Sequence, residues 1–345
     1  MTPPMHQSKN VRIKPSFSIV AHDADTVELR HGVWNVRSYT LTDHARTGRL
    51  YGLLRGLDGT ASRADVAKAN GVTRAEVEAL VDHLDQLGVI ARAPETALDS
   101  YLESTGAYTT EAPAPPVVVL GGYALAAATA RVLDGSLPGG VEVAGEDDPL
   151  HRALLEADPV ALEDGLTFER FTERFEPWRG KVLVHVAEEP HPLRLSVLNR
   201  IALALRTPWI QAAVDGPMLL IGPAFSPPAS ACFACFETRV LMNLRESAAY
   251  QRYKDALVRR SIRAGEPPTL DALRALVAGH VGLEALNLAL TGTTTTLGKV
   301  LGIYVPTMEI AYSEVLRLPG CRACGPVPER EATELYFDVR RWIDA

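Results

Sequence analysis

Residues 117–133 read VVVLGGYALAAATARVL. The four apolar residues at the start predict a strand that is buried on both faces, as the strands of a parallel sheet are. Gly121 and Gly122 form a turn, and the alanine-rich residues 125–133 predict a helix. A strand, a glycine turn and a helix in this order are typical of the start of an α/β domain. The run is interrupted by Arg131 and is shorter than a membrane span of about 20 residues.

The chain after this segment continues the same alternation. Short apolar runs predict further strands at residues 141–144, 181–187 and 208–214, with a helix at 193–205 before the last of them. Two long helical stretches and two β-rich segments come next, at residues 241–263, 270–290, 300–305 and 308–316. Continuous apolar strands that alternate with helices predict a parallel sheet covered on both faces.

The residues before position 111 have a different pattern. The segment EAPAPP at 111–116 is rich in proline and predicts a short, stiff linker. Before it, β-branched and aromatic runs between Asp and Gly turn signals predict a three-stranded meander at residues 17–22, 26–31 and 33–41. Three helices are predicted next, from residue 43 or 44 to 57, from 62 to 70 and from 73 to 88. Three strands and a helix-turn-helix indicate a winged-helix-like module.

Local signals define the second and third of these helices. Ser62 and Asp65 have the spacing of a capping box, and Gly71 follows the second helix. Thr73 caps the third helix. Apolar residues in the third helix recur at helical spacing and form one stripe, namely Val77, Leu80, Val81, Leu84 and Leu87.

The four cysteines form two identically spaced pairs. They read CFAC at Cys232 and Cys235 and CRAC at Cys321 and Cys324, with 85 residues between the pairs. Two CxxC turns supply the four thiolates of a tetrahedral structural zinc site, so the spacing predicts Zn²⁺. The alternatives are four unrelated buried thiols or one redox-active CxxC pair. If all four are ligands, no cysteine is left to act as a nucleophile.

The charge distribution argues against nucleic acid as a partner. The 345 residues carry a net charge of −7. The helix-turn-helix raises the alternative of a DNA-binding regulator, but residues 74–88, where a recognition helix would lie, have a balance of −3. Such a helix repels the phosphate backbone that it must approach. Residues 1–95 are nearly neutral, with 12 basic and 11 acidic residues.

The first 20 residues show no apolar core followed by a small-residue cleavage site. A soluble, cytoplasmic protein without a membrane partner is therefore expected. The sequence leaves homodimerisation open.

The order of these segments resembles one family. A strand, glycine turn and helix, a later strand at residues 182–187, the segment PWIQAA at 208–213 and two distant CxxC pairs occur in this order in the ThiF-like adenylating enzymes, which are relatives of the ubiquitin-activating enzymes. With its winged-helix-like start, the chain is similar to the ocin-ThiF-like proteins. These bind leader peptides in the biosynthesis of thiazole/oxazole-modified microcins and thiopeptides. The segment LRLPGCRACG at 316–325 resembles the closing zinc knuckle of that branch.

This resemblance implies a fold and a role. It implies a winged-helix precursor-peptide recognition element at 1–95, a helix and linker at 96–116, and a Rossmann-like ThiF-type α/β domain with a four-cysteine zinc site at 117–345. The protein would bind the leader of a ribosomal precursor peptide and present the core to a YcaO-type cyclodehydratase. That partner would use ATP to convert Cys, Ser or Thr into azolines. The chain itself would have no catalytic residue.

Departures from the family pattern argue against adenylation by this chain, which is the alternative function. The second and third positions of the GxGxxG turn are Tyr123 and Ala126, and a tyrosine would take the space of the phosphates. The strand at 141–144 ends without the ribose-binding aspartate, although Asp147 follows shortly after. The family's magnesium-binding aspartate is Glu188 here.

The segment that follows the second strand carries a further departure. Residues 146–180 lack the Gln and Lys that hold a triphosphate in the family, and their charge balance is −6. ATP is therefore not expected as a cofactor.

The predicted peptide groove combines an edge strand and a helix face. An extended leader adds to an unpaired strand edge by backbone hydrogen bonds, and the strand at 33–41 is taken as that edge. The groove residues predicted on the strand and on the outer face of the third helix are Val36, Arg37, Ser38, Tyr39, Glu76, Ala79 and His83. The alternative is that these are ordinary solvated surface positions.

Overall fold

The computed structural model describes residues 10–34, 37–91, 96–107, 109–110, 112–263, 265 and 268–325. They belong to two compact units, Met1–Tyr108 and Thr109–Ala345. Each unit contains both helices and sheet, so the fold is of the mixed α/β kind that the sequence predicts.

The N-terminal unit contains four helices and two small antiparallel sheets within its described residues. Its elements are, in chain order, β1 (Asn10–Ile13), β2 (Ser18–Ala21), β3 (Thr26–His31), β4 (Arg37–Thr42), α1 (Leu50–Gly56), β5 (Asp58–Ser62), α2 (Arg63–Asn70), α3 (Arg74–Gln86), β6 (Ile90–Ala91) and α4 (Ala97–Thr105). The predicted meander is present as the sheet β2-β3-β4. A second sheet, β5-β1-β6, was not predicted, because strands of two to five residues give almost no periodic signal.

Local hydrogen bonds explain where the helices of this unit begin. Both predicted caps are confirmed, since Ser62 and Thr73 each form a complete capping box with the residue three positions later. The first helix was predicted to start at residue 43 or 44, but α1 starts at Leu50. The carboxylate of Asp43 instead accepts hydrogen bonds from the backbone N–H groups of Ala45 and Thr47, which favours a turn there.

The apolar stripe of α3 packs into the core of the N-terminal unit. Val77, Val81 and Leu84 are buried, and Leu80 and Leu87 are half-buried at the margin of the stripe. Val27 and Leu29 of β3 reach the same core from the sheet. The helical period therefore identified the buried face of α3 correctly.

The C-terminal unit is built on one seven-stranded sheet. Its elements are β7 (Val117–Gly121), α5 (Tyr123–Leu133), β8 (Val141–Ala144), α6 (Pro149–Glu156), η1 (Ala161–Glu163), α7 (Gly165–Glu173), η2 (Glu176–Trp178), β9 (Val182–Ala187), α8 (Pro192–Leu205), β10 (Trp209–Asp215), β11 (Met218–Phe225), α9 (Phe233–Asn243), α10 (Ser247–Val258), α11 (Asp271–Thr291), β12 (Lys299–Tyr304) and β13 (Glu309–Glu314). The strand order is β13-β12-β11-β10-β9-β7-β8.

The sheet is mixed, whereas the sequence predicted a parallel one. Strands β8, β7, β9 and β10 are parallel, whereas β11, β12 and β13 are antiparallel to their neighbours. Only Gly216 and Pro217 separate β10 from β11. Two residues are too few for the crossover that a parallel strand needs, so β11 returns as a hairpin.

The continuous helix predicted at residues 241–263 is wrong, because this range contains only the end of α9 and then a separate helix, α10, which ends at Val258. The chain leaves helical geometry after Asn243 and re-enters it at Ser247. The first helix, α9, begins at Phe233, directly after the N-cap residue Cys232.

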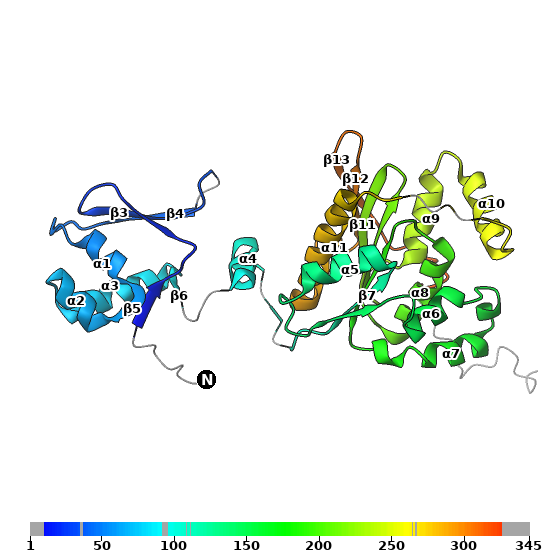
Figure 1. Ribbon diagram of the computed structural model, residues 1–345, viewed down its shortest axis with the longest axis horizontal. Helices are drawn as coiled ribbons and strands as arrows, with labels where there is room; N and C mark the ends of the chain where they lie inside the picture. Colours follow the sequence, from blue (N-terminus) through cyan, green and yellow to red (C-terminus); the bar gives the residue numbers. More distant parts are fainter. Residues whose placement is uncertain are drawn as a thin grey trace, which may run out of the picture. The chain divides into compact units, whose positions relative to one another are not determined.

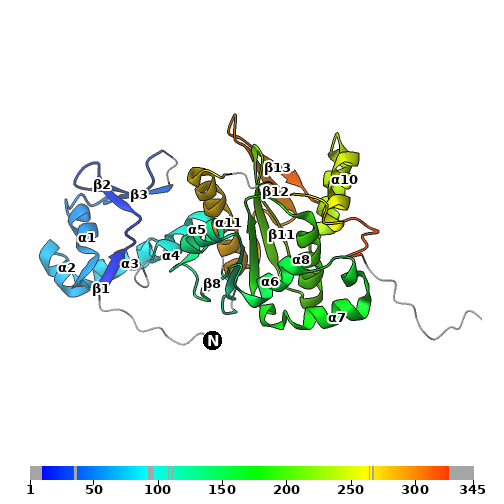
Figure 2. The same cartoon turned by 45° about the vertical axis from the view of Figure 1, so that its right-hand side comes forward.

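Helices cover both faces of the parallel part of the sheet. Figures 1 and 2 show α5 and α11 on one face and α6 and α8 on the other. By length and composition alone α11 could cross a membrane, but half of that stretch is buried inside the unit, as in a core helix. At the far edge, β13 has all six residues exposed, and Ile310 and Tyr312 are 58% and 52% exposed.

Candidate functional site

The four cysteines lie together, although two distant parts of the chain supply them. All four Sγ atoms lie within 4.8 Å of one another. The Sγ atom of Cys232 is 3.9 Å from that of Cys235 and 3.7 Å from that of Cys321, and the Sγ atoms of Cys235 and Cys324 are 3.5 Å apart. None of the four forms a disulfide. The structure thus brings together all the ligands that the two CxxC pairs predict.

Local backbone geometry aims the thiols at one point. Cys232 is the N-cap residue of α9, and Cys235 lies in the first turn of that helix. The second pair lies in the loop after β13, where the N–H of Gly325 donates a 2.8 Å hydrogen bond to the carbonyl oxygen of Cys321. A Cβ at position 325 would lie 2.4 Å from that oxygen, so the turn requires glycine. The glycine directly after the last cysteine therefore has a steric role.

The cysteine cluster fits a tetrahedral metal ion. A tetrahedral site with Zn–S bonds of about 2.3 Å places its sulfur atoms roughly 3.8 Å apart. The observed distances of 3.5–3.9 Å between neighbouring Sγ atoms agree with this value. Burial raises the pKa of Cys232. Burial also acts to raise the pKa of Cys321, but hydrogen bonds from the backbone of Cys324 and Ala323 outweigh it and lower the value to about 7. A metal ion in this cluster would hold the sulfurs as thiolates.

A second region of interest is the turn after β7, where a nucleotide would bind in a doubly wound sheet. Gly121 has φ of +152°, and a Cβ there would lie 2.0 Å from the carbonyl oxygen of Val186 on β9. Tyr123 begins α5 and is 84% exposed, so its ring is not packed into the turn. This corrects one step of the sequence argument, since a ring held by so few contacts is a weak steric block.

Glu188, which stands at the magnesium-ligand position of the resemblance, is held in an ion pair. Its two carboxylate oxygens lie 2.6 and 3.1 Å from Nε and Nη2 of Arg274. Hydrogen bonds from Arg274 lower the pKa of Glu188, and Asp271 binds the same guanidinium. The two arginine contacts on this carboxylate compete with any cation.

The acidic stretch 146–180 has a structural use that the sequence did not reveal. Asp148 caps α6 by accepting hydrogen bonds from two backbone N–H groups, and Asp164 caps α7. Hydrogen bonds from Thr167 lower the pKa of Asp164. Part of the negative charge therefore stabilises helix starts.

The predicted peptide residues on the edge strand are placed as follows. Among the described residues β4 pairs only with β3, which leaves its other edge without a strand. Arg37 and Ser38 are exposed, and Tyr39 is half-buried with its ring centroid 6.1 Å from that of Phe17. Val36 lies outside the described residues.

The three groove residues predicted on α3 do not all have the same surroundings. Ala79 and His83 are exposed, as expected. Glu76 is exposed too, but its carboxylate accepts a 2.7 Å hydrogen bond from the backbone N–H of Thr73 and belongs to the capping box. Glu76 therefore already has a structural partner, whereas Ala79 and His83 project from the helix.

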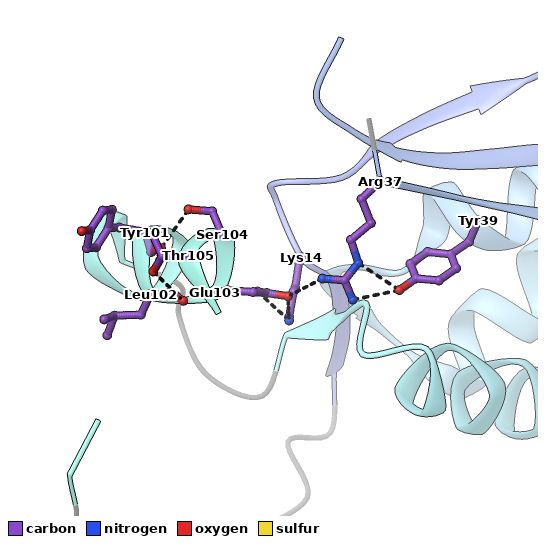
Figure 3. A network of polar contacts seen from close by, with 8 residues as sticks. All are labelled: Lys14, Arg37, Tyr39, Tyr101, Leu102, Glu103, Ser104 and Thr105. Carbon is purple, nitrogen blue, oxygen red and sulfur yellow. Dashed lines mark hydrogen bonds and ion pairs between the residues drawn. The ribbon is translucent and has the colours of Figure 1, made fainter. Parts of the chain in front are cut away.

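Two residues that the sequence analysis did not single out lie beside Arg37 (Figure 3). Both carboxylate oxygens of Glu103 lie 2.8 Å from Nζ of Lys14, and Oε1 lies 3.7 Å from Nη1 of Arg37. Arg37 also donates hydrogen bonds of 3.0 and 2.8 Å from Nε and Nη2 to the hydroxyl of Tyr39. Lys14 and Glu103 are 89 residues apart, so no spacing pattern could have joined them.

Comparisons with known proteins give a likeness of fold. No family model matches the chain, and no curated protein matches it. The heterocyclase TruD is 20% identical with a TM-score of 0.63, over 92% of this chain and 43% of TruD. A heterocyclase in complex with substrate and cofactor is 15% identical with a TM-score of 0.64, over 91% of this chain and 39% of that chain.

A smaller protein shares the fold over its whole length. E. coli MccB, in complex with AMPCPP and MccA, is 14% identical with a TM-score of 0.54, over 92% of this chain and all of MccB. The present chain thus spans less than half of either heterocyclase but the full length of MccB.

Proposed function

We propose that the protein is a non-catalytic partner in the biosynthesis of azole-containing ribosomal peptides. The N-terminal unit acts as a winged-helix recognition element that binds the leader of a precursor peptide. The protein then presents the core of that peptide to a separate YcaO-type cyclodehydratase in the cytoplasm. The shared fold with two heterocyclases, one of them bound to substrate, supports this role.

The observation that carries the proposal is the open edge of β4. Its backbone N–H and C=O groups on that side have no strand partner among the described residues, and an extended peptide can add there as a further strand. Arg37 and Tyr39 stand along this edge, and Ala79 and His83 are exposed on α3. We take these positions as the groove.

Three features support a loss of adenylation. The phosphate turn keeps Gly121 but lacks the second glycine, whose missing side chain lets the backbone approach phosphates; the exposed ring of Tyr123, which stands there, is only a weak steric block. Glu188 is engaged by Arg274. The segment 146–180 provides no lysine or glutamine. An ATP-dependent adenylating enzyme remains the alternative, because MccB was solved with AMPCPP and shares the fold over its whole length.

We further propose that the cysteine cluster holds one structural Zn²⁺ ion. The four thiols match the ligand type and the spacing that zinc prefers in closed structural sites. In this role the metal ties the start of α9 to the loop after β13, and no thiol is left for nucleophilic chemistry.

The first prediction concerns nucleotide. We expect weak or no binding of Mg-ATP by full-length protein in isothermal titration calorimetry, and no ATP–pyrophosphate exchange, because Glu188 is paired and the phosphate turn lacks its second glycine. A dissociation constant in the micromolar range, or exchange that depends on an added peptide, would favour the adenylating alternative.

The second prediction concerns the leader. We expect a short precursor gene beside the gene for this protein, and a fluorescent synthetic leader taken from that precursor should bind the full-length protein. Ala79→Arg should weaken binding by about tenfold or more, because a bulky cation in the groove costs more than about 1.4 kcal/mol. Fluorescence anisotropy measures the effect.

The matched control for this variant is Ala69→Arg. Ala69 is an exposed alanine on the neighbouring helix α2, so the same substitution there should leave affinity unchanged. If Ala79→Arg and Ala69→Arg bind the leader with the same affinity, and a zinc-site variant does not bind it, the peptide binds to the C-terminal unit instead.

A further inference from the structure

The carboxylate of Glu103 is bound by two cationic side chains, which come from different parts of the N-terminal unit. Lys14 follows β1, Arg37 begins β4, and the Tyr39 hydroxyl binds the same guanidinium (Figure 3). The side chains of Lys14 and Glu103 are only 20% and 28% exposed. We call Lys14, Arg37 and Tyr39 the basic site. Two cations this close, partly shielded from water, favour the presence of a carboxylate between them.

The helix that supplies this carboxylate is weakly anchored. No residue of α4 is buried. Its own caps are complete, since Thr96 and Asp99 form a capping box and Gly106 adopts a left-handed conformation at the other end. A helix of nine residues is nevertheless marginal on its own in water, so its amides lose protection when its contacts with the rest of the unit are lost. Elements with few buried side chains open at the lowest cost in free energy.

The basic site lies where a peptide added to β4 would place side chains. Every second residue of β4 lies on the same face of the sheet. On one face these residues are Arg37, Tyr39 and Leu41, which pair with His31, Leu29 and Val27 of β3. A strand added on the other side of β4 alternates in the same way, and its side chains on that face come within about 5 Å (Cβ–Cβ) of their neighbours. A carboxylate on such a side chain can reach Arg37 and the adjacent Lys14.

We infer that the basic site is a carboxylate-binding subsite for an acidic side chain of the leader, and that Glu103 occupies it as an internal competitor in the free protein. The inference rests on the proposed function. On leader binding an aspartate or glutamate of the peptide replaces Glu103, and α4 leaves the basic site. The peptide class that the protein selects therefore carries an acidic residue on the strand that pairs with β4.

Competition of this kind has a defined effect on affinity. If the basic site is open in only a fraction of the molecules, the apparent dissociation constant rises by the reciprocal of that fraction. Removing the competing charge while keeping the size of the side chain should abolish this penalty. Glu103→Gln should therefore bind the leader roughly fivefold more tightly than the natural protein does.

The experiment measures the affinity of the synthetic leader for full-length variants by anisotropy. Glu176→Gln is the matched control, because it removes one negative charge of an ion pair in the C-terminal unit, away from the proposed groove. It should leave affinity unchanged, whereas Glu103→Gln should increase it. In a protein with Lys14→Met and Arg37→Met, binding should be weaker by about tenfold, and Glu103→Gln should have no further effect.

A second experiment varies the peptide, and a third is done without peptide. Leaders in which each Asp or Glu is changed singly to its amide should include one that loses affinity for the natural protein but not for the double-methionine variant. Without peptide, Glu103→Gln should speed hydrogen exchange of the α4 amides severalfold, whereas Glu176→Gln should not.

The outcomes separate this inference from the function on which it rests. If the leader binds the natural protein and Glu103→Gln equally well, or if an all-amide leader binds as tightly as the acidic one, the carboxylate subsite is wrong while leader binding stands. If the leader binds no variant, the proposed function fails and the subsite fails with it.

Discussion

Replacing Cys232 by serine is expected to remove the metal and to destabilise the C-terminal unit. We expect the purified protein to contain about one zinc per chain and the variant to contain almost none. Structural zinc contributes folding free energy directly, and its loss should cost at least about 3 kcal/mol. For a unit of this size that corresponds to a fall in Tm of roughly 6–12 °C. Elemental analysis and differential scanning calorimetry measure the two effects.

The control is Arg322→Ser, because Arg322 is an exposed residue between the two cysteines of the second pair. It should keep both the zinc and the Tm. Cys321→Ser should behave like Cys232→Ser, since both thiols face the same point at 3.7 Å from each other. A metal-free protein of unchanged stability, or a disulfide within either pair, would contradict the zinc assignment.

The second large effect is expected from Gly121→Ala, at the end of β7. An added Cβ would lie 2.0 Å from the backbone oxygen of Val186, and φ of +152° is rarely adopted by residues with a side chain. Strain and overpacking together should cost about 3–5 kcal/mol, because neither β7 nor β9 can move without disturbing the centre of the sheet. The measurement is urea unfolding followed by circular dichroism.

The adjacent glycine provides the control. Gly122 has φ of −60°, and an added Cβ there meets nothing within 4 Å. Gly122→Ala should therefore change stability by less than about 1 kcal/mol. Equal stability of the two variants would show that the approach of β7 to β9 is looser than the structure has it.

The sequence predicted the elements that have strong local or periodic signals. The buried strand β7 and the stripe of α3 follow from uninterrupted or regularly spaced apolar residues. The sheet β5-β1-β6 and the hairpin strand β11 were not predicted. Their existence depends on pairing between segments, and pairing leaves little trace in the local pattern. The predicted end of the recognition element at residue 95 and that of the linker at residue 116 stay predictions.

The candidate sites also divide into those that the sequence predicts and those that it does not. The cysteine cluster could be predicted because metal ligation imposes a fixed spacing on each pair. The pairing of Glu103 with Lys14 and that of Glu188 with Arg274 could not, because each joins single charged residues more than 80 positions apart. The capping role of Asp148 was also missed, since the acidic stretch was analysed for net charge. Single long-range ion pairs become visible only when the chain is folded.

The exposed strand β13 has a consequence for how copies of this protein behave at high concentration. Among the described residues no strand pairs with the outer edge of β13, and an unpaired edge that carries Ile310 and Tyr312 is a template for the growth of aggregates by strand pairing between molecules. Glu309 and Glu314 stand at the two ends of the strand. Two copies that pair antiparallel along it would bring the first glutamate of one next to the last of the other. Repulsion between these carboxylates opposes such pairing, so we expect the flanking glutamates to limit aggregation through this edge.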